Sequence, residues 1–344
     1  MSHLRRELGM AAALLAMCVG LYVSNHDFLG QSNVVNTTRQ IAMLGILSIG
    51  IAFVIITGGI DLSIGSIIGL TGVIIARISS PSFDGLNYSF WIGVPVALGV
   101  ALLIGLVQGL LITRLELQPF IVTLGGMLLL RGVSQTIVKG GTIGFGVSNF
   151  PDLANSGLFL RDGDPLLPYP VIICVAVILI ATYVLHFTVF GRYVYAIGGN
   201  REAAAYSGIN VKRVETTTYV ISAGLAGVAG VCYAAYIGQM SQQVGIAYEL
   251  YAIAAAVLGG CSLRGGEGTI LGVIIGSAVM RVIDNGITMF QFKYVTAAGK
   301  HRIFRLNENW TYIIIGAVIL VAVIIDQVAH KLQSRRRARR AGAA

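Results

Sequence analysis

Six polar side chains interrupt the long apolar stretches of this 344-residue sequence, and they could bind a polar solute. Three of them are amides, which both donate and accept hydrogen bonds and so suit the hydroxyl groups of a neutral solute. The same amides could instead hold neighbouring helices together. Arg281 and Asp284 stand three residues apart and can neutralise each other on one helix face, which favours a structural role. The six residues are Gln108, Arg131, Gln135, Arg281, Asp284 and Asn285.

The sequence contains no constellation for catalysis or for a metal. No GxxxxGK[ST] motif occurs, because the Gly299-Lys300-His301 stretch lacks the leading glycine spacing and the hydroxyl residue. The four cysteines form no CxxC pair and are predicted to be small core residues. We therefore predict that the chain is not an enzyme, that it holds no metal or cofactor, and that any ATP is hydrolysed elsewhere.

Composition places these residues in a membrane protein. The chain is 56% apolar and 11% charged with a mean hydropathy of +0.80, whereas a soluble protein is about 25% charged. Recurring apolar runs predict an all-α integral membrane protein, a polytopic bundle of about ten transmembrane helices in a single domain, 1–344. The predicted spans are 8–25, 41–57, 62–78, 90–112, 120–138, 169–189, 214–237, 247–261, 269–290 and 309–327.

Charge placement predicts the orientation. The net charge of +9 is spread over short loops and both ends, so the positive-inside bias explains it better than nucleic-acid binding does. The presumed inner side, which includes the tail 328–344, holds 14 Lys and Arg against 8 on the outer side. Both termini are therefore predicted in the cytoplasm. The basic segment 291–308 does not fit this orientation, because it falls on the outer side. Either it is an insertion with its own role, or the last predicted hairpin is misplaced.

Small residues recur at every fourth position in three spans. Such stripes let helix backbones approach closely, which drives helix association in lipid. They predict tight helix packing, and a sliding surface for transport is a second interpretation. The stripes are Gly93, Ala97, Ala101, Gly105 and Gly109; Ala226, Gly230, Ala234 and Gly238; and Gly268, Gly272 and Gly276.

The polar stretch 190–213 contains a short helix with both ends marked. Asn200 is a good N-cap, Glu202 adds negative charge to the first turn, and Gly208 suits a left-handed C-cap. A helix of about two turns is marginal alone, so something must brace it, either the membrane domain or a soluble partner. An ordinary loop helix is one interpretation of this pattern.

The second interpretation comes from a resemblance. The stretch GGNREAAAYSGI resembles the coupling-helix loop of permease subunits of ABC importers, in the ribose-type monosaccharide branch. In that family the helix docks into a groove of the ATPase subunit. The resemblance implies a coupling role for Asn200, Arg201, Glu202, Ala203, Ala204, Ala205, Ser207 and Gly208.

Two glycine-rich turns extend this resemblance. In the first turn, two glycines end one helix and either Asp61 or Ser63 can cap the next, so a tight capped turn near the cytoplasmic face is the simple interpretation. The stretch GGIDLSIGS also resembles the GGIDLSxGS signature of ribose, xylose and related sugar permeases, and 118–125 and 258–268 resemble further motifs of that family. The signature residues are Gly58, Gly59, Asp61, Ser63, Gly65, Gly259, Gly260, Gly265 and Gly266.

The similarity covers about residues 40–290 and implies a permease subunit of a bacterial inner-membrane ABC importer for a monosaccharide. It implies two permease chains, a separate ATPase that binds ATP and Mg²⁺, and a sugar-binding protein outside. Because charges are costly at mid-membrane, Gln108, Gln135 and Asn285 are the predicted lining of the substrate path.

Two other classes compete with this interpretation. An ion-coupled secondary transporter of a small polar solute needs a coupling site near the bilayer midplane, usually a carboxylate or an unwound helix. Asp61, Asp284 and Glu249 are expected nearer span ends, which disfavours that class. A membrane scaffold without transport leaves the loop helix and the polar span residues without a role.

Overall fold

The computed structural model describes residues 2–81, 85–146, 148–161, 164–295, 301–305, 310–311, 313–314, 316–317, 320–321 and 324. Seven described helical segments are long and apolar enough to cross a membrane, and α3 and α11 are shorter apolar helices. The helices that match predicted spans are α1 (Ser2–Ser24), α2 (Gln31–Ile56), α3 (Ile64–Ser79), α4 (Phe90–Arg114), α5 (Pro119–Val138), α7 (Tyr169–Thr182), α10 (Val211–Ile237), α11 (Tyr248–Leu258) and α12 (Ile270–Met289).

The all-α membrane class predicted from composition is confirmed, and nine predicted spans have a helix in the structure. The main difference is α2, which begins at Gln31 instead of 41. Its polar first turns are satisfied by α10, because the Tyr236 hydroxyl donates to Asn36 Oδ1 at 2.8 Å and the Arg39 guanidinium lies 5.5 Å from the Tyr236 ring centroid. Only part of the predicted span 309–327 is described, and every described position in it is helical.

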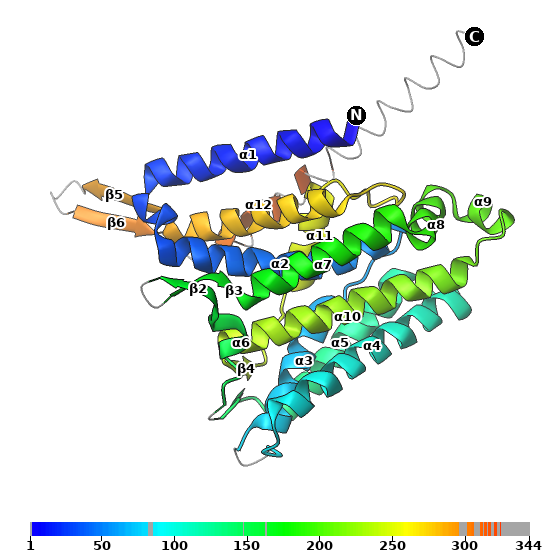
Figure 1. The fold of residues 1–344 in the computed structure, drawn as a ribbon, viewed down its shortest axis with the longest axis horizontal. Coiled ribbons are helices and arrows are strands. Elements are labelled where there is room, and N and C mark those ends of the chain that lie inside the picture. The colour runs from blue at the N-terminus through cyan, green and yellow to red at the C-terminus, as the bar shows by residue number, and fades with distance from the viewer. Residues whose placement is uncertain are drawn as a thin grey trace, which may run out of the picture.

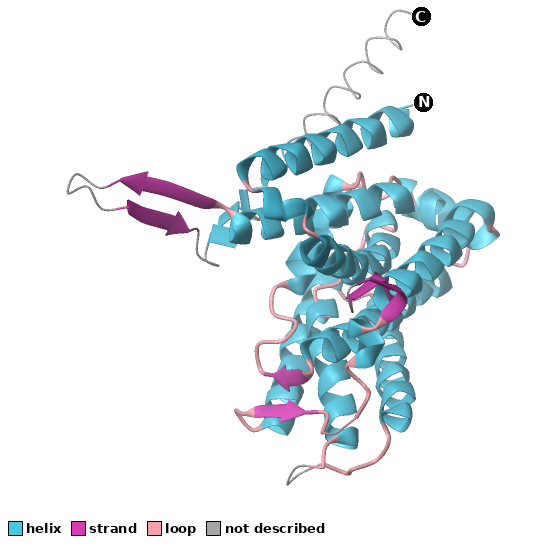
Figure 2. Cartoon of the chain, turned by 60° about the vertical axis from the view of Figure 1, so that its left-hand side comes forward, coloured by secondary structure: helices cyan, strands magenta, loops and turns pink. Residues whose placement is uncertain are grey.

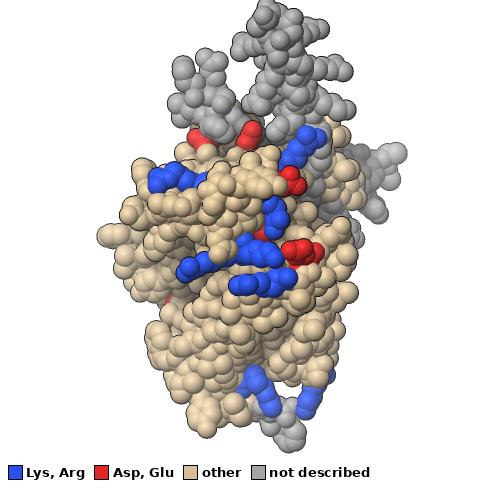
Figure 3. Space-filling view, turned by 90° about the vertical axis from the view of Figure 1, so that its right-hand side faces the viewer, with Lys and Arg blue, Asp and Glu red and all other residues tan. Residues whose placement is uncertain are grey.

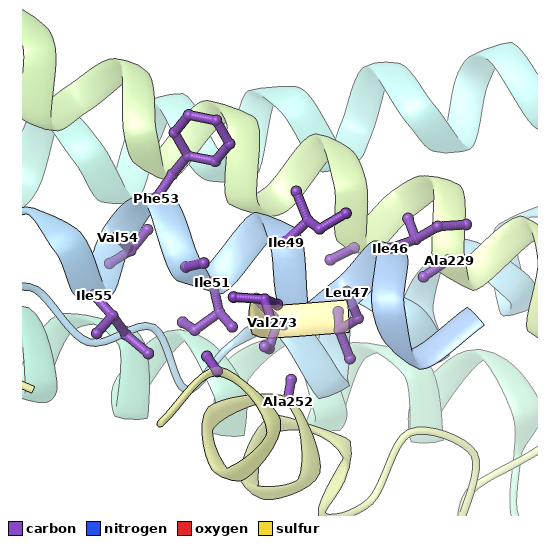
Figure 4. Packing of buried hydrophobic residues seen from close by; sticks show 14 of the residues in the cluster. Ile46, Leu47, Ile49, Ile51, Phe53, Val54, Ile55, Ala229, Ala252 and Val273 are labelled. Atoms are coloured by element: carbon purple, nitrogen blue, oxygen red, sulfur yellow. The ribbon is translucent and has the colours of Figure 1, made fainter. Parts of the chain in front are cut away.

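The core is organised around α2 (Figure 4). Most of its length is buried, and its aliphatic side chains meet Ala229 of α10, Ala252 of α11 and Val273 of α12. Helix α10 in turn packs along α2, α3 and α4. One long apolar helix therefore sits at the centre, and the elements that carry polar groups surround it.

The small-residue stripes form helix contacts where they lie in helices, as predicted, whereas Gly238 caps the end of α10, where a Cβ would meet no atom within 4 Å, and Gly268 precedes α12. A Cβ on Gly105 would lie 2.6 Å from the carbonyl oxygen of Tyr219, and one on Gly230 would lie 3.1 Å from the Cα of Ile68. A Cβ on Gly276 would lie 2.0 Å from the carbonyl oxygen of Ala255. These glycines bring α4 and α3 against α10, and α12 against α11.

The described chain forms three two-stranded sheets (Figure 2), of which β1 with β4 joins two distant loops and the other two are local hairpins. They lie toward the end of the bundle opposite α9 (Figure 1). The basic outer segment contributes one of them, so part of it is a hairpin. The pairs, all antiparallel, are β1 (Thr142–Gly144) with β4 (Gln239–Ser241), β2 (Gly157–Arg161) with β3 (Asp164–Pro168), and β5 (Gln291–Val295) with β6 (His301–Arg305).

The remaining short elements complete the chain order. The loop after the π-helical turn η2 lies at the same end of the bundle as the start of α1 (Figure 1), which agrees with the predicted side for both. These elements are η1 (His26–Leu29), α6 (Asp152–Asn155), η2 (Tyr183–Phe187), α8 (Val189–Gly199) and α9 (Arg201–Tyr206).

Candidate functional site

The predicted loop helix is present as α9, with both ends as expected. The side chain of Asn200 accepts a hydrogen bond from the Ala203 amide at 2.9 Å, which caps the first turn. The Ser207 amide donates to the Ala203 carbonyl, and Gly208 follows at φ +84. Local capping chemistry therefore defines this helix before any partner is present.

Helix α9 projects from the bundle (Figure 1) and is braced at few points. Ala204 is its one buried residue, whereas Tyr206 is 91% exposed. The described chain therefore anchors α9 by one small side chain and leaves its remaining faces free.

One ion pair holds the base of α9 to α10, and a second joins α10 to the segment between α4 and α5. Arg201 Nε lies 2.8 Å from Glu215 Oε1 on α10, and this hydrogen-bonded contact raises the pKa of Arg201. Lys212 Nζ lies 2.9 Å from Glu116 Oε1, and the hydrogen bond from Lys212 lowers the pKa of Glu116. Basic side chains gather with acidic partners on this face (Figure 3).

The glycine turns and the end of α8 form one backbone junction. The Gly266 amide donates to the Ile56 carbonyl at 2.8 Å. A Cβ on Gly265 would lie 2.9 Å from both the Gly198 Cα and the Gly58 nitrogen. Gly58 and Gly265 also have positive φ. The two signature turns thus meet directly beneath the loop that carries α9.

Asp61 is the centre of a sealed polar network. Its Oδ1 accepts from the Ser63 amide at 2.9 Å and the Ser63 hydroxyl at 2.7 Å, and its Oδ2 accepts from the Ser222 hydroxyl at 2.9 Å. Ser63 Oγ also lies 3.0 Å from the Gln108 amide group. The Ser63 hydroxyl is therefore within hydrogen-bonding distance of two acceptors, Asp61 Oδ1 and Gln108 Oε1.

This geometry corrects two expectations. Ser63 stands at the N-cap position of α3 without a side-chain capping bond, and Asp61 closes the preceding turn instead of capping α3. Asp61 also lies beside Ser222, 11 residues from the start of α10 and 15 from its end, not near a span end. The non-helical segment 57–63 folds into the bundle and carries the carboxylate with it.

Glu249 is the second residue of α11 and so lies near a span end, as expected, but this end is buried in the bundle beside the start of α3. A Cβ on Gly65 would lie 2.0 Å from Glu249 Oε2, so α3 and α11 begin side by side. Glu249 is 8% exposed, and its Oε2 has no hydrogen-bond partner among the described residues. Arg131 Nη2 donates nearby to the Gly245 carbonyl at 3.3 Å. The contact between Glu249 and the start of α3 could not be predicted from the sequence, because it depends on segment 239–247 folding back into the bundle.

The three predicted path amides lie apart. Gln108 is buried in the Asp61 network, whereas Asn285 and Asn33 exchange hydrogen bonds of 2.8 and 3.2 Å. Gln135 is exposed on α5. One chain therefore does not bring them into a common lining.

Arg281 and Asp284 form the expected pair, with Nη1 3.2 Å from Oδ2. Arg281 also donates to the Tyr233 hydroxyl at 2.6 Å and lies 5.5 Å from the Tyr248 ring centroid. These contacts between α10, α11 and α12 support the structural role predicted for the pair.

The fold and these contacts define a class of protein: a multi-pass membrane protein with buried polar groups and a capped helix, α9, that projects from the bundle. The family model described as branched-chain amino acid transport system / permease component matches residues 33–323, and the chain belongs to this family. Membership of this family excludes the secondary-transporter and scaffold alternatives. Asp61 does not lie near a span end, so the position of the carboxylates alone would not disfavour a secondary transporter.

Named relatives match nearly the whole chain. It is 36% identical over 315 residues to the ribose import permease protein of Escherichia coli (strain K12), covering 91% of each chain. It is 35% identical over 329 residues to the galactose/methyl galactoside import permease protein of Haemophilus influenzae, covering 92% of this chain and 93% of the relative. It is 34% identical over 302 residues to the fructose import permease protein of Rhizobium meliloti, covering 86% and 77%. No solved structure matches the chain.

Proposed function

We propose that this chain is the membrane-spanning permease subunit of an ABC importer that carries a monosaccharide across a bacterial inner membrane. Relatives named for the import of ribose, galactose/methyl galactoside and fructose support a sugar as the substrate. A separate ATPase subunit binds ATP and Mg²⁺ in this proposal, since the sequence has no phosphate-binding loop.

The observation that carries the proposal is the geometry of α9. Its cap bonds are satisfied internally, one small residue is buried, and its other side chains are exposed. A short helix that is folded and yet uncovered suits a partner groove. In the proposal the ATPase receives α9, and closure of the ATPase on ATP moves α9 and tilts the spans.

The remaining partners follow from orientation. Both termini and α9 face the cytoplasm in this proposal, and a sugar-binding protein docks at the opposite end. A second copy of the chain is the proposed partner for α5, whose exposed face carries Ile121 and Leu128 and where Gly125 and Gly132 meet no atom within 4 Å. A dimer could also bring separated amides such as Gln135 to a shared path.

The coupling role is tested in the reconstituted importer. Ala204→Pro removes the amide that donates to Asn200 O at 3.0 Å, and Glu202→Lys reverses the charge in the first turn. Both changes should abolish sugar-stimulated ATP turnover while the permease still inserts. Lys139→Glu, a charge reversal outside this loop, should leave turnover unchanged. Normal coupled turnover in both α9 variants would show that α9 is not the transmission element.

Orientation is tested by cysteine labelling. Tyr206 on α9 is 91% exposed and Leu160 on β2 is 71% exposed, at opposite ends of the bundle. An impermeant thiol reagent applied to intact cells should label Leu160→Cys alone. Labelling of Tyr206→Cys from outside would reverse the proposed orientation.

A further inference from the structure

A pocket of about 380 Å³ opens at the end of the bundle that carries α9. Its walls come from the first glycine turn, the segment between α4 and α5, the start of α9 and the first half of α10. Three sequence motifs that are far apart in the chain therefore converge on it. The lining residues are Thr57, Gly58, Gly59, Ile112, Glu116, Leu117, Gln118, Pro119, Arg201, Glu215 and Tyr219.

The lining chemistry suits a small neutral molecule with several hydroxyl groups. Glu116, Gln118 and Thr57 offer acceptors and donors, and a tyrosine ring and aliphatic side chains supply apolar walls. The volume falls within the range of about 300–1,000 Å³ typical of small-molecule sites. Glu215 is already paired with Arg201 and Glu116 with Lys212, so the pocket presents no strong net charge to select an ion.

Tyr219 sits at the inner limit of this pocket. The Tyr219 side chain is 2% exposed, and its hydroxyl has no hydrogen-bond partner among the described residues. A Cβ on Gly59 would lie 2.6 Å from that hydroxyl oxygen, so the ring end presses on the glycine turn. Ser222, one turn further along α10, belongs to the sealed Asp61 network. The Tyr219 side chain thus separates the open pocket from the buried polar groups.

We propose that this pocket is the cytoplasmic release site for the imported monosaccharide, with the Tyr219 ring as its inner closure and the Tyr219 hydroxyl as a sugar contact when that closure opens. The assignment rests on the proposed importer function. Arg201 both begins α9 and lines the pocket, and its partner Glu215 precedes Tyr219 by one helical turn. Movement of α9 would therefore displace one wall and the closure together.

Removal of the hydroxyl distinguishes a sugar contact from a packing role. If Tyr219 only packs, Tyr219→Phe removes an unpartnered buried hydroxyl and should be neutral or stabilising. If the hydroxyl binds sugar, Tyr219→Phe should slow uptake by about three- to tenfold, the equivalent of one hydrogen bond. The thermal stability of Tyr219→Phe should not fall. Tyr183→Phe, the same change on a 63% exposed side chain, is the matched control.

A labelling experiment locates the sugar directly. In inside-out vesicles holding the whole importer, ribose, galactose and fructose are tested separately for protection of Leu117→Cys from a maleimide. Leu115→Cys, outside the pocket lining and exposed, is the control. The transported sugar should slow labelling of Leu117→Cys alone.

The outcomes separate the two proposals. Full uptake by Tyr219→Phe together with unprotected Leu117→Cys, in an importer that transports one of these sugars, overturns the release site and leaves the proposed function intact. Failure of the unaltered importer to transport any of the three overturns the proposed function for these sugars and the release site with it.

Discussion

Arg201 and Glu215 form a bidentate ion pair, with Arg201 Nε 2.8 Å from Glu215 Oε1 and Arg201 Nη2 3.1 Å from Glu215 Oε2. Paired parallel contacts of this kind fix direction as well as distance. The pair joins the first residue of α9 to the second turn of α10. Because the Arg201 side chain is 56% exposed, the ion pair contributes more to the position of α9 than to the stability of the protein.

Exchanging the two charges tests this link. Arg201→Glu and Glu215→Arg alone should each lower sugar-stimulated ATP turnover in the reconstituted importer. The double variant should recover part of it, with a coupling energy of about 0.2–1 kcal/mol. Lys212→Gln, which breaks only the neighbouring pair with Glu116, is the control for general loss of charge. Additive losses in the double variant would show that the two side chains act independently.

The Glu116–Lys212 contact predicts a pH dependence of stability. The hydrogen bond from Lys212 lowers the pKa of Glu116 below its ordinary 4.5, so the folded state favours the charged carboxylate. The stabilisation is present above the ordinary pKa and is lost as the pH falls through the lowered folded-state pKa. The difference in Tm between the parent and Glu116→Gln should therefore be present at neutral pH and disappear in acid. A difference in Tm that does not shrink as the pH falls below 4.5 would refute this assignment.

Gly198 and Gly199 provide a matched pair at the backbone junction. A Cβ on Gly198 would lie 1.8 Å from the Ile56 carbonyl oxygen and 2.3 Å from the Gly266 nitrogen, whereas one on Gly199 meets no atom within 4 Å. Gly198→Ala should destabilise the protein by about 1–3 kcal/mol, because backbone must move. Gly199→Ala should change stability by less than about 0.5 kcal/mol. Unfolding midpoints in detergent measure both, and equal midpoints would mean that the junction is loose.

Spans and caps were predictable because their causes are local. Runs of apolar residues define where helices cross lipid, and Asn200 and Gly208 mark α9 through bonds within a few residues. The resemblance to sugar permeases also depended on contiguous motifs, and family membership confirmed it.

The interior of the site depends on contacts that sequence spacing does not express. Asp61 and Ser222 are 161 positions apart, and Glu249 reaches Gly65 only because 239–247 turns into the bundle. Apolar periodicity contains no signal for that turn. The path amides were chosen for their chemistry alone, and the chain places Gln108 and Asn285 in separate hydrogen-bonded pairs.

Removal of the Ser222 hydroxyl should destabilise the protein more than removal of another buried serine hydroxyl. It is the side-chain partner of Asp61 Oδ2, and both residues are fully buried. Ser222→Ala would leave that carboxylate oxygen without this donor, and loss of a hydrogen bond to a buried charged group costs about 1.5–3 kcal/mol. Ser277 is an equally buried serine whose hydroxyl donates to the Val273 carbonyl of its own helix at 2.9 Å. Ser277→Ala should therefore cost less than about 1 kcal/mol.

Denaturant titration of the two purified variants in detergent gives the comparison, with Asp61→Asn and Asp61→Asn,Ser222→Ala as third and fourth samples. Without a charge on residue 61, the missing hydroxyl matters less, so the double variant should lose less than the sum of its single changes. Equal destabilisation by Ser222→Ala and Ser277→Ala would mean that the Asp61 carboxylate does not depend on α10, and that the segment 57–63 is held in the bundle by its backbone alone.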